Sequence, residues 1–568
     1  MPSVPLRNRI RSAVASIVRR RMIRAKDRFL KVAHTSCRET QHKTLTRLLA
    51  LNADSRFSAR HGLSPNPGVA EFRRRLKPAD YEVFRPWIDQ MVAGDHRALL
   101  GSQNTLLMYA VTSGTTAAAK LIPVTQQFVN DYRRGWQFWG MGVYQQHPAL
   151  ALSKIVQISS THKRWKTSDG IPCGNISGLA SAMQKKLVRK LYTIPAAVAG
   201  ISEAAAKQQT VATFALADPW VGMFVTANPA TLLQLMDCAN NNAEAILRDI
   251  HDGNLSACAG QNGHVSPLKR LLPRNPQRAQ QLEQMLAQQG RLEAPDCWPS
   301  LVCLGVWTGG SSAAYRRQLQ DLFPGVPIRD HGLHASEGRM TIPFEDDTPS
   351  GLLDVETHFF EFIPYREHES SDPVVLQAHE LEADQDYFIL LTTSSGLYRY
   401  NIYDVVRCTG FHGTTPLISF LHKGAHISSI TGEKITESQV VSAVRAGSES
   451  TGLKLKQFTL TPIWGQPPGY RLFLRISDGE PANPDLCARL ATETDQELSR
   501  LNCEYADKRG TSRLRLIDCQ VLSDHLWQAF EKNRIKESGG SPEQYKHPCL
   551  MPDRAFEGRF IRLTEHTE

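Results

Sequence analysis

The chain has 568 residues, of which 41% are hydrophobic and 21% are charged, as in an ordinary soluble globular protein with room for several domains and a large core. We expect neither a membrane-spanning helix nor a secretory signal, because no apolar segment has the required length or flanks. The net charge of +10 resides almost entirely in residues 1–31, and the nearly neutral remainder argues against a nucleic-acid-binding protein.

Residues 1–31 contain ten Lys or Arg and one acid, and they predict an amphipathic basic helix. Four aliphatic side chains recur there at helical spacing: Ile10, Val14, Ile17 and Val18. Two interpretations stay open: a weak contact with an anionic membrane or a partner, and a solvated first helix packed on the main domain. An Arg-rich start with few acids is also typical of a transit peptide.

The eleven cysteines are scattered and include no CxxC pair and no His/Cys cluster at metal-ligand spacing. An odd number of scattered cysteines favours reduced, mostly buried thiols, so we expect a cytoplasmic protein. We also expect it to be a monomer.

Residues 32–100 predict helices, which lead into a strand that begins at Leu106. The strand enters a Ser/Thr/Gly-rich loop at 112–116, and the chain then passes Lys120 and reaches Thr125, a candidate helix N-cap. Small residues let a backbone approach a polyanion, and hydroxyls with free N–H groups can surround phosphate oxygens. The Walker A spacing is missing, so the loop by itself is more typical of an ordinary Ser/Thr turn.

Residues 180–290 are predicted to be mainly helical, and a strand–turn–helix–strand unit follows them. Its strands at 301–307 and 326–333 enclose a Gly/Ser turn at 308–312 and a helix at 313–323. This alternation predicts a parallel sheet with helices on its faces, whose ligands bind at the carboxyl ends of the strands. Both small-residue turns lie at such ends.

Residues 351–422 alternate with period two and predict an antiparallel β-rich subdomain. After a boundary near residues 423–429, the rest predicts a small α+β domain, with a Thr436/Gln439 capping box, strands at 458–464 and 470–476, a helix at 484–508, a strand, and a helix at 524–537. The predicted fold class is α/β. A large N-terminal domain (1–425) has mainly parallel helix-covered sheets and the β-rich subdomain, and a smaller, mobile C-terminal α+β domain covers 426–568.

Several segments stand in one characteristic order along the chain. They are the Ser/Thr/Gly loop with Lys120, the second Gly/Ser turn, HASEG (334–338), GLYRYNIYDVVRCTGF (396–411), ITGEKITE (430–437) and QYKHP (544–548). With YEVFRPWIDQMVAGD (81–95), this order resembles the auxin-responsive acyl acid amido synthetases, the Gretchen Hagen-type branch of the acyl-adenylate-forming enzymes. The resemblance covers most of the chain.

The resemblance implies a ligase that uses ATP and Mg²⁺ on a small carboxylic acid and an amino acid. The acid attacks the α-phosphate of ATP to give an acyl-adenylate and pyrophosphate, and the amine then displaces AMP to form an amide. Two alternatives remain: an acyl-CoA ligase or another acyl-adenylate-forming enzyme with a thiol acceptor, and a non-catalytic nucleotide-binding scaffold. An aromatic stripe including Trp136 and Trp139, and a basic loop at 161–178, suit an aromatic or amphipathic acid, although core packing and a solvated loop explain them equally well.

The resemblance also assigns roles to residues of this sequence. Phosphate binding falls to Thr112, Ser113, Gly114, Thr115 and Thr116. Glu337 becomes the Mg²⁺ ligand, a hard carboxylate for a hard cation, and Asp404 the acceptor of both ribose hydroxyls. His334 takes the position, usually aromatic, that stacks near adenine, and Ala335 and Ser336 are counted with it as nucleotide-binding.

Two lysines match those of the family's mobile C-terminal domain, Lys546 and Lys434. We favour Lys546 for adenylation, with Lys434 second. Four departures mark a divergent member: an alanine triplet at 117–119, Tyr403 in place of a glycine, Lys423 in place of the usual arginine, and His334 in place of tyrosine. They put the identity of the acid substrate most in doubt.

Overall fold

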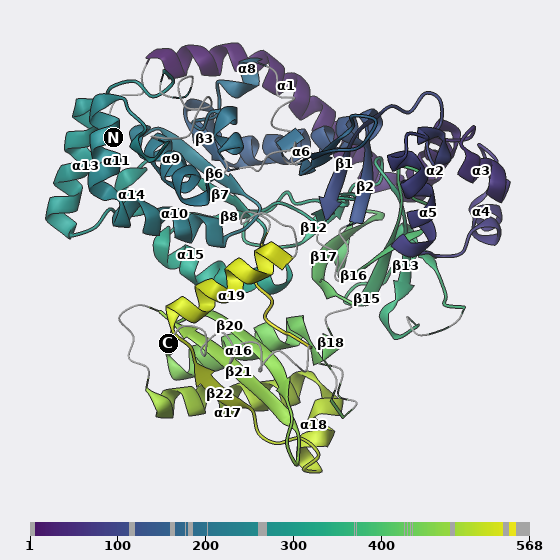
Figure 1. Cartoon of the computed structure of the whole chain (residues 1–568). Helices are drawn as coiled ribbons and strands as arrows, with labels where there is room; N and C mark the ends of the chain where they lie inside the picture. The colour runs from purple at the N-terminus through teal and green to yellow at the C-terminus, as the bar shows by residue number, and fades with distance from the viewer. Residues whose placement is uncertain are drawn as a thin grey trace.

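The computed structural model describes residues 6–112, 120–158, 165–176, 178–179, 186–201, 203–258, 268, 270–367, 370, 372–424, 427–428, 430–431, 433, 435–477, 483–537 and 545–552. A larger N-terminal part and a smaller C-terminal part lie one above the other in Figure 1. No helix within the described ranges is both long enough and apolar enough to cross a bilayer.

The chain begins with helices, which confirms the prediction for residues 32–100. They are α1 (Leu6–Thr35), α2 (Cys37–Leu51), α3 (Arg56–His61), α4 (Val69–Arg75) and α5 (Tyr81–Val92). Two of them have side-chain caps: Ser55 accepts a hydrogen bond at the start of α3, and Asp80 accepts one at the start of α5. The long α1 extends across the top of the larger part and packs on α6 (Figure 1).

The Ser/Thr/Gly loop joins two antiparallel strands, β1 (Leu106–Thr112) and β2 (Lys120–Thr125). Lys120 therefore begins a strand, and Thr112 pairs with it across the hairpin. The prediction for Thr125 is confirmed, since its Oγ1 accepts a hydrogen bond from Phe128 N at 3.2 Å and caps α6 (Gln126–Gln146). The sheet is completed by β5 (Pro172–Gly174), which is parallel to β1, and β4 (Trp165–Lys166).

A second sheet is entirely parallel, with the order β3-β6-β7-β8. Its strands are β3 (Lys154–Gln157), β6 (Val221–Thr226), β7 (Cys303–Val306) and β8 (Ile328–Asp330). Helices surround it, namely α8 (Lys186–Arg189), α9 (Ala204–Ala217), α10 (Ala230–Asn241), α11 (Ala243–Asp252), α13 (Pro276–Gln289), α14 (Ala294–Cys297) and α15 (Arg316–Leu322). The mainly helical prediction for 180–290 missed β6, because a six-residue apolar run between helices cannot be distinguished from helix by periodicity.

The predicted β-rich subdomain is a seven-stranded antiparallel sheet with the order β11-β12-β17-β16-β15-β13-β14. The strands are β11 (Thr341–Ile342), β12 (Gly351–Leu353), β13 (Phe359–Pro364), β14 (Leu376–Gln377), β15 (Asp386–Thr392), β16 (Tyr400–His412) and β17 (Thr415–Lys423). A small hairpin of β9 (His334–Ala335) and β10 (Gly338–Arg339) links the parallel sheet to it.

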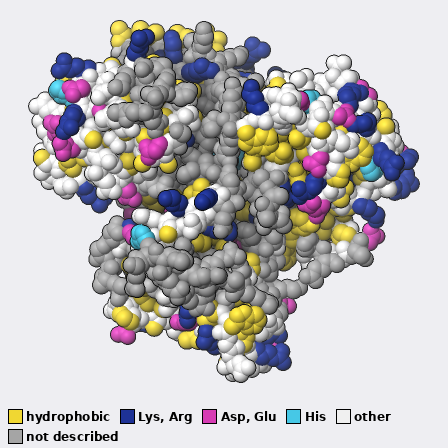
Figure 2. Space-filling view, in the orientation of Figure 1, with side chains coloured by type: hydrophobic (Ala, Val, Ile, Leu, Met, Phe, Trp, Pro, Cys, Tyr) yellow, Lys and Arg dark blue, Asp and Glu magenta, His cyan; other side chains and the backbone are white. Residues whose placement is uncertain are grey.

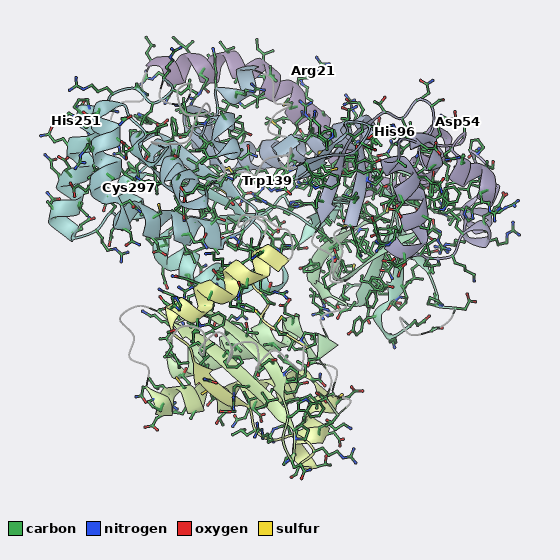
Figure 3. All side chains as sticks on the ribbon, in the orientation of Figure 1. Arg21, Asp54, His96, Trp139, His251 and Cys297 are labelled. Carbon is green, nitrogen blue, oxygen red and sulfur yellow. The ribbon has the colours of Figure 1, made fainter. Side chains whose placement is uncertain are left out.

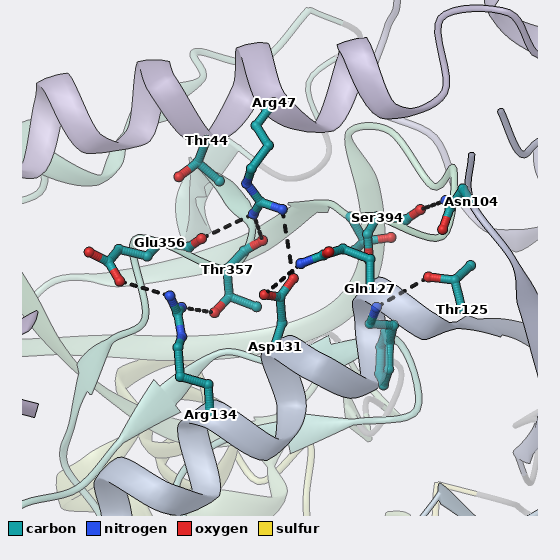
Figure 4. A network of polar contacts seen from close by, with 12 residues as sticks. Thr44, Arg47, Asn104, Thr125, Gln127, Asp131, Arg134, Glu356, Thr357 and Ser394 are labelled. Carbon is teal, nitrogen blue, oxygen red and sulfur yellow. Dashed lines mark hydrogen bonds and ion pairs between the residues drawn. The ribbon is translucent and has the colours of Figure 1, made fainter. Parts of the chain in front are cut away.

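Polar contacts hold α6 against this subdomain (Figure 4). Arg134 of α6 donates to Asp354 at 3.0 Å, to Glu356 at 2.7 Å and to Thr357 Oγ1 at 2.8 Å. Arg47 of α2 donates to the carbonyl oxygens of Glu356 and Thr357 from the other side. Because Arg134 fixes α6 against residues 354–357, which Arg47 holds from the other side, the aromatic stripe of α6 has a defined position.

The C-terminal part contains a three-stranded sheet with its own core. Its elements are β18 (Ile427–Ser428), β19 (Ile435–Thr436), α16 (Glu437–Thr451), β20 (Leu455–Ile463), β21 (Gly469–Ile476), α17 (Pro484–Leu501), α18 (Cys503–Gly510), β22 (Asp518–Val521) and α19 (Asp524–Glu537). The Thr436/Gln439 capping box is confirmed. The single helix predicted for 484–508 is wrong, because Asn502 ends α17 and its Oδ1 accepts from Tyr505 N to begin α18.

Candidate active site

Two side chains form an ion pair across β16 and β17, neighbouring inner strands of the seven-stranded sheet. Asp404 of β16 lies directly opposite Lys423 of β17, and the lysine ammonium contacts Oδ1 of the aspartate. Asp404 is 3% exposed, and Lys423 Nζ also donates to the Ile402 carbonyl at 3.2 Å. Burial lowers the pKa of Lys423, but the negative charges of Asp404 and Glu337 outweigh it and leave this pKa raised.

Backbone strain precedes this aspartate. Tyr403 has φ +58°, in the left-handed region that side chains disfavour by about 1 kcal/mol, and its N–H donates to Asn401 Oδ1 at 2.8 Å. The sequence places Tyr403 where the resembling family has glycine, so the chain keeps a glycine-type conformation with a tyrosine. Such retained strain next to a buried carboxylate is typical of a functional site.

Glu337 lies in the turn between β9 and β10 and is 9% exposed. Tyr400 Oη, at 3.5 Å from Oε1, is a weak donor to it. Burial raises the pKa of Glu337, Asp404 raises it further, and Lys423 and Lys120 oppose the shift. The structure thus brings together Glu337, Asp404, Lys423 and Lys120, from four separate segments.

Lys546 reaches the same region from the C-terminal part. Its Nζ lies 5.0 Å from the ring centroid of Trp307, the residue that follows β7. Asn228, after β6, donates to the Tyr545 carbonyl at 2.7 Å and so ties the segment to the parallel sheet. Part of the Lys546 side chain is open to solvent, but the protein around its ammonium lowers its pKa by desolvation. The positive charge of Lys423 lowers this pKa further, and the negative charge of Asp404 raises it.

The carboxyl ends of β7 and β8 are tied together by Asp330. Its Oδ2 accepts hydrogen bonds from Thr308 N at 2.6 Å and Thr308 Oγ1 at 2.5 Å, and its Oδ1 accepts from Gly332 N at 2.6 Å. Burial raises the pKa of Asp330 to about 6, although these donors stabilise the charged form. The second Gly/Ser turn therefore begins at a fixed point of the sheet edge, as the sequence predicts.

His334 lies on the same side of the site. Its Nδ1 is 2.8 Å from the Gly332 carbonyl, and its ring centroid is 5.8 Å from that of Trp136 and 6.4 Å from that of Trp307. Burial, with smaller contributions from Arg339 and Lys546, lowers the pKa of His334 to about 3. Its imidazole is therefore neutral near pH 7. Ala335 and Ser336 follow it, half-buried, in the hairpin.

Part of the predicted phosphate-binding set lies outside the described residues, namely Ser113, Gly114, Thr115, Thr116 and also Lys434. Thr112 is described only by its backbone at the end of β1. The far end of the loop is Lys120, whose Nζ lies 5.3 Å from the Tyr81 ring centroid and whose charge reaches Glu337. The loop thus ends close to the buried carboxylates.

The sequence prediction did not assign a role at the site to Trp307, Tyr400 or Arg339. Trp307 and Tyr400 are aromatic residues within or just after apolar strands, where core packing is the commoner explanation. Arg339 offered a clearer signal, since it is a basic residue two positions after Glu337 and is followed by the mainly apolar segment 340–344.

A second group of metal-ligand type lies elsewhere, formed by His147, Cys303 and Asp346. The Asp346 carboxylate is already bound by His147 Nε2 at 2.7 Å and by Arg329 Nε at 2.8 Å. A guanidinium beside the carboxylate disfavours a cation there, so this group is best explained as a buried ion-pair network.

Comparisons with known proteins agree over nearly the whole chain. The GH3 family N-terminal domain matches residues 26–328, the GH3 family central domain matches 351–423, and the GH3 family C-terminal domain matches 438–555. The chain is 22% identical over 548 residues to the indole-3-acetic acid-amido synthetase GH3.3 of Arabidopsis thaliana, covering 92% of this chain and 90% of that protein. It is also 22% identical over 531 residues to the jasmonoyl–L-amino acid synthetase JAR4 of Nicotiana attenuata, with 90% and 91% covered.

Solved structures show the same fold. The GH3.15 acyl acid amido synthetase superimposes with a TM-score of 0.81 at 21% identity, over 94% of both chains. The AtGH3.15 acyl acid amido synthetase in complex with 2,4-DB superimposes with a TM-score of 0.83 at 20% identity, over 96% of both chains. The predicted fold class is confirmed by these likenesses and by the sheets described above.

Proposed function

We propose, because the chain belongs to the GH3 family, that it is an acyl acid amido synthetase. It adenylates a carboxylic acid with ATP and transfers the acyl group to the amine of an amino acid, giving an amide, AMP and pyrophosphate. One observation carries the proposal: Asp404 acts on the ionisation of both Glu337, in the β9–β10 turn, and Lys546, which lies beside Trp307 at the carboxyl end of strand β7 of the parallel sheet. Ligands of such sheets bind at this edge.

In the first half-reaction, an oxygen of the acid's carboxylate bonds to the α-phosphorus of ATP, and the bond from that phosphorus to pyrophosphate breaks. Negative charge grows on the oxygens of the α-phosphate, and the ammonium of Lys546 would stabilise it. Lys434 is proposed as the second lysine.

The nucleotide would be positioned by the remaining predicted residues. Asp404, which is buried and follows the strained backbone of Tyr403, would accept the ribose hydroxyls. The loop at 112–116 would hold the phosphates, and His334, with Ala335 and Ser336, would contact the base side. Neutral His334 suits contact with an uncharged base.

Glu337 fits a magnesium ion. It is a buried carboxylate whose side-chain donor, Tyr400, is at the limit of hydrogen-bond distance, and burial raises the pKa of Glu337. A hard divalent cation would keep such a group ionised. Magnesium, when bound there, would neutralise phosphate charge.

In the second half-reaction, the unprotonated amine of the amino acid bonds to the acyl carbon, the bond from that carbon to the AMP oxygen breaks, and the amine loses a proton. We propose that the domain of residues 426–568 moves relative to residues 1–425 between the two steps. Lys423, near this boundary and paired with Asp404, would couple the movement to the nucleotide site.

The test is to incubate the protein with MgATP, a panel of acids, and either amino acids or coenzyme A, and to measure pyrophosphate and products by mass spectrometry. We expect acid-dependent pyrophosphate release, with an amide as product. Formation of a thioester and no amide would overturn the proposal in favour of an acyl-CoA ligase, and ATP binding with no turnover would favour a scaffold.

The exposed face of α1 suggests an additional contact. On the anchored side, Asn8 is buried and Arg11 donates to the Ser153 carbonyl at 2.7 Å. The opposite side exposes aliphatic residues followed by arginines, and Figure 2 shows both kinds of side chain along the top edge. These residues are Leu6, Ile10, Val14, Ile17, Val18, Arg20, Arg21, Arg24 and Arg28. We propose that this face lies on an anionic lipid surface, since an aliphatic stripe beside guanidinium groups suits an interface.

We also propose that the protein acts as a monomer in the cytoplasm. The ten cysteines whose side chains are described are all free thiols, which is consistent with a reducing compartment. Light scattering of the purified chain and its localisation in cells test these two points.

A further inference from the structure

Arg339 of β10 is buried without a counter-ion. It is 1% exposed, its Nη2 donates to the His331 carbonyl at 2.6 Å, and its Nε and Nη1 have no hydrogen-bond partner among the described residues. Gly135 of α6 permits this position, because a Cβ there would fall 2.4 Å from Cδ of the arginine. The chain has therefore made room for a guanidinium in its interior.

The guanidinium remains charged. Burial lowers the pKa of Arg339 to about 10, with Tyr132, Asp354 and Asp330 acting against the shift. No carboxylate within the described ranges forms an ion pair with it. Buried cations are normally paired because desolvation of an unpaired charge is costly, so two free donors on a buried cation indicate a missing anionic partner.

Asp354 and Asp330 act on the guanidinium only from beyond ion-pair distance, and the nearest side chains around it are aromatic rings. The guanidinium carbon lies 4.4 Å from the ring centroid of Trp136, whose ring also contacts Trp139, His331 and His334. Within the described ranges neither ring nitrogen of His331 has a hydrogen-bond partner, and burial, with His334 and Arg339, keeps the pKa of this histidine well below its usual value. The wall is thus aromatic and neutral apart from Arg339. Trp139 lies deep in the larger part in Figure 3.

This wall is continuous with the candidate active site. His334 pairs with Arg339 across the hairpin and lies between Trp136 and Trp307. Trp307 in turn carries the ammonium of Lys546 at 5.0 Å. An acid lying along these rings with one carboxylate near Lys546 would direct its other end towards Arg339.

We infer that Arg339 is a specificity-determining residue that binds a second carboxylate on the acyl acid. The preferred substrate is then a dicarboxylic acid with an apolar or aromatic centre, of which one end is adenylated and the other forms a bidentate ion pair with the guanidinium. This inference rests on the proposed function and narrows its substrate class.

The test compares monocarboxylic and dicarboxylic acids of equal carbon number: hexanoate with adipate, decanoate with sebacate, and 4-ethylphenylacetate with 1,4-phenylenediacetate. Acid-dependent pyrophosphate release gives kcat/KM for each acid. We expect at least one diacid to exceed its matched monoacid by about tenfold or more, since a bidentate charged pair is lost with the monoacid. The Arg339→Met variant should reduce this ratio to near one, and Arg339→Lys should retain part of it.

Arg278→Met is the matched control. Arg278 of α13 is also a buried arginine without an ion pair among the described residues, but its Nε and Nη2 donate to the carbonyls of Leu216 and Cys297 at 2.8 and 2.7 Å. Its loss should lower the melting temperature and leave the diacid-to-monoacid ratio as in the unaltered protein. If Arg339→Met does not fold, the thermal shift caused by adipate or phenylenediacetate in the unaltered protein and in Arg339→Lys supplies the second measurement.

The outcomes are distinguishable. A diacid preference that depends on Arg339 supports the inference. Equal use of monoacids and diacids, or a ratio unchanged in Arg339→Met, overturns it and leaves the proposed function intact. If no acid of either class causes pyrophosphate release although MgATP still binds, the proposed function itself is overturned.

Discussion

The two sides of the site treat charge differently. On the side that we propose binds the nucleotide, Asp404 is paired with Lys423, and the ionisation of Glu337 is influenced by Lys423 and Lys120. On the aromatic side, Arg339 stands among neutral rings without a carboxylate partner in the described residues. Where the protein pairs its own buried charges, a ligand does not need to supply a counter-ion. Where a buried charge is unpaired, the ligand can supply the missing counter-ion. The first arrangement suits a common substrate such as ATP, and the second suits selection among acids.

The largest expected effect comes from the cation shared by both sides. Lys546→Ala should reduce acid-dependent pyrophosphate release by about 100-fold or more, as for loss of a charge that stabilises a transition state. Lys434→Ala should have a smaller effect. The exposed Lys532 of α19 provides the control variant Lys532→Ala, which should leave the rate unchanged. Full adenylation activity in Lys546→Ala would refute the assignment.

Glu337→Gln should follow in size. The amide keeps the shape of the side chain but removes the charge that would bind magnesium, so we expect a loss of about 10- to 100-fold and a higher magnesium concentration at half-maximal rate. A magnesium titration of pyrophosphate release measures both. An unchanged magnesium dependence would show that Glu337 is not the ligand.

The Asp404–Lys423 pair can be broken from either side. Asp404→Asn should raise KM for ATP more than it lowers kcat, and a double-mutant cycle with Lys423→Met should give a coupling of about 1–3 kcal/mol in unfolding free energy, with solvent screening at the partly exposed lysine reducing it. Denaturant unfolding of the four proteins measures the coupling. Additive effects would show that the pair is not energetically linked.

The aromatic side should make the stability of the protein depend on pH. Because burial lowers the pKa of His334 to about 3, below an unfolded value of about 6.5, its contribution to stability is present above pH 6.5 and is lost as the pH falls towards 3. His334→Gln should make the melting temperature less sensitive to pH in this window, by an amount equivalent to about 1–3 kcal/mol. A curve of melting temperature against pH for both proteins tests this, and parallel curves would contradict it.

The smallest effect on catalysis is expected at α1, outside both sides. Ile10→Ser with Ile17→Ser, at positions 55% and 76% exposed, should weaken binding to vesicles that contain anionic lipid and leave turnover in solution unchanged. Co-sedimentation with neutral and anionic vesicles measures the binding. Equal binding of the double variant and the unaltered chain would remove the lipid proposal.

Much of the architecture could be predicted from the sequence, because its signals are local. The Thr125 cap, the Thr436/Gln439 capping box and helix 524–537 depend on neighbouring residues, and the structure confirms them. The failures were also physical. Strand β6 was missed because a short apolar run suits either a strand or a buried helix, and α17 was drawn too long because the break depends on Asn502 bonding to both Tyr505 and Glu433.

By itself, the sequence determined the order of the motifs, and that order was enough to identify the family before any geometry was known. It also marked Glu337, Asp404 and Lys546, since residue type and order along the chain survive without a fold. Only the tertiary structure showed that Lys423 neutralises Asp404 and that Arg339 has no carboxylate partner among the described residues. Charge compensation depends on distance and burial between segments far apart in the chain, and neither quantity is encoded in local spacing.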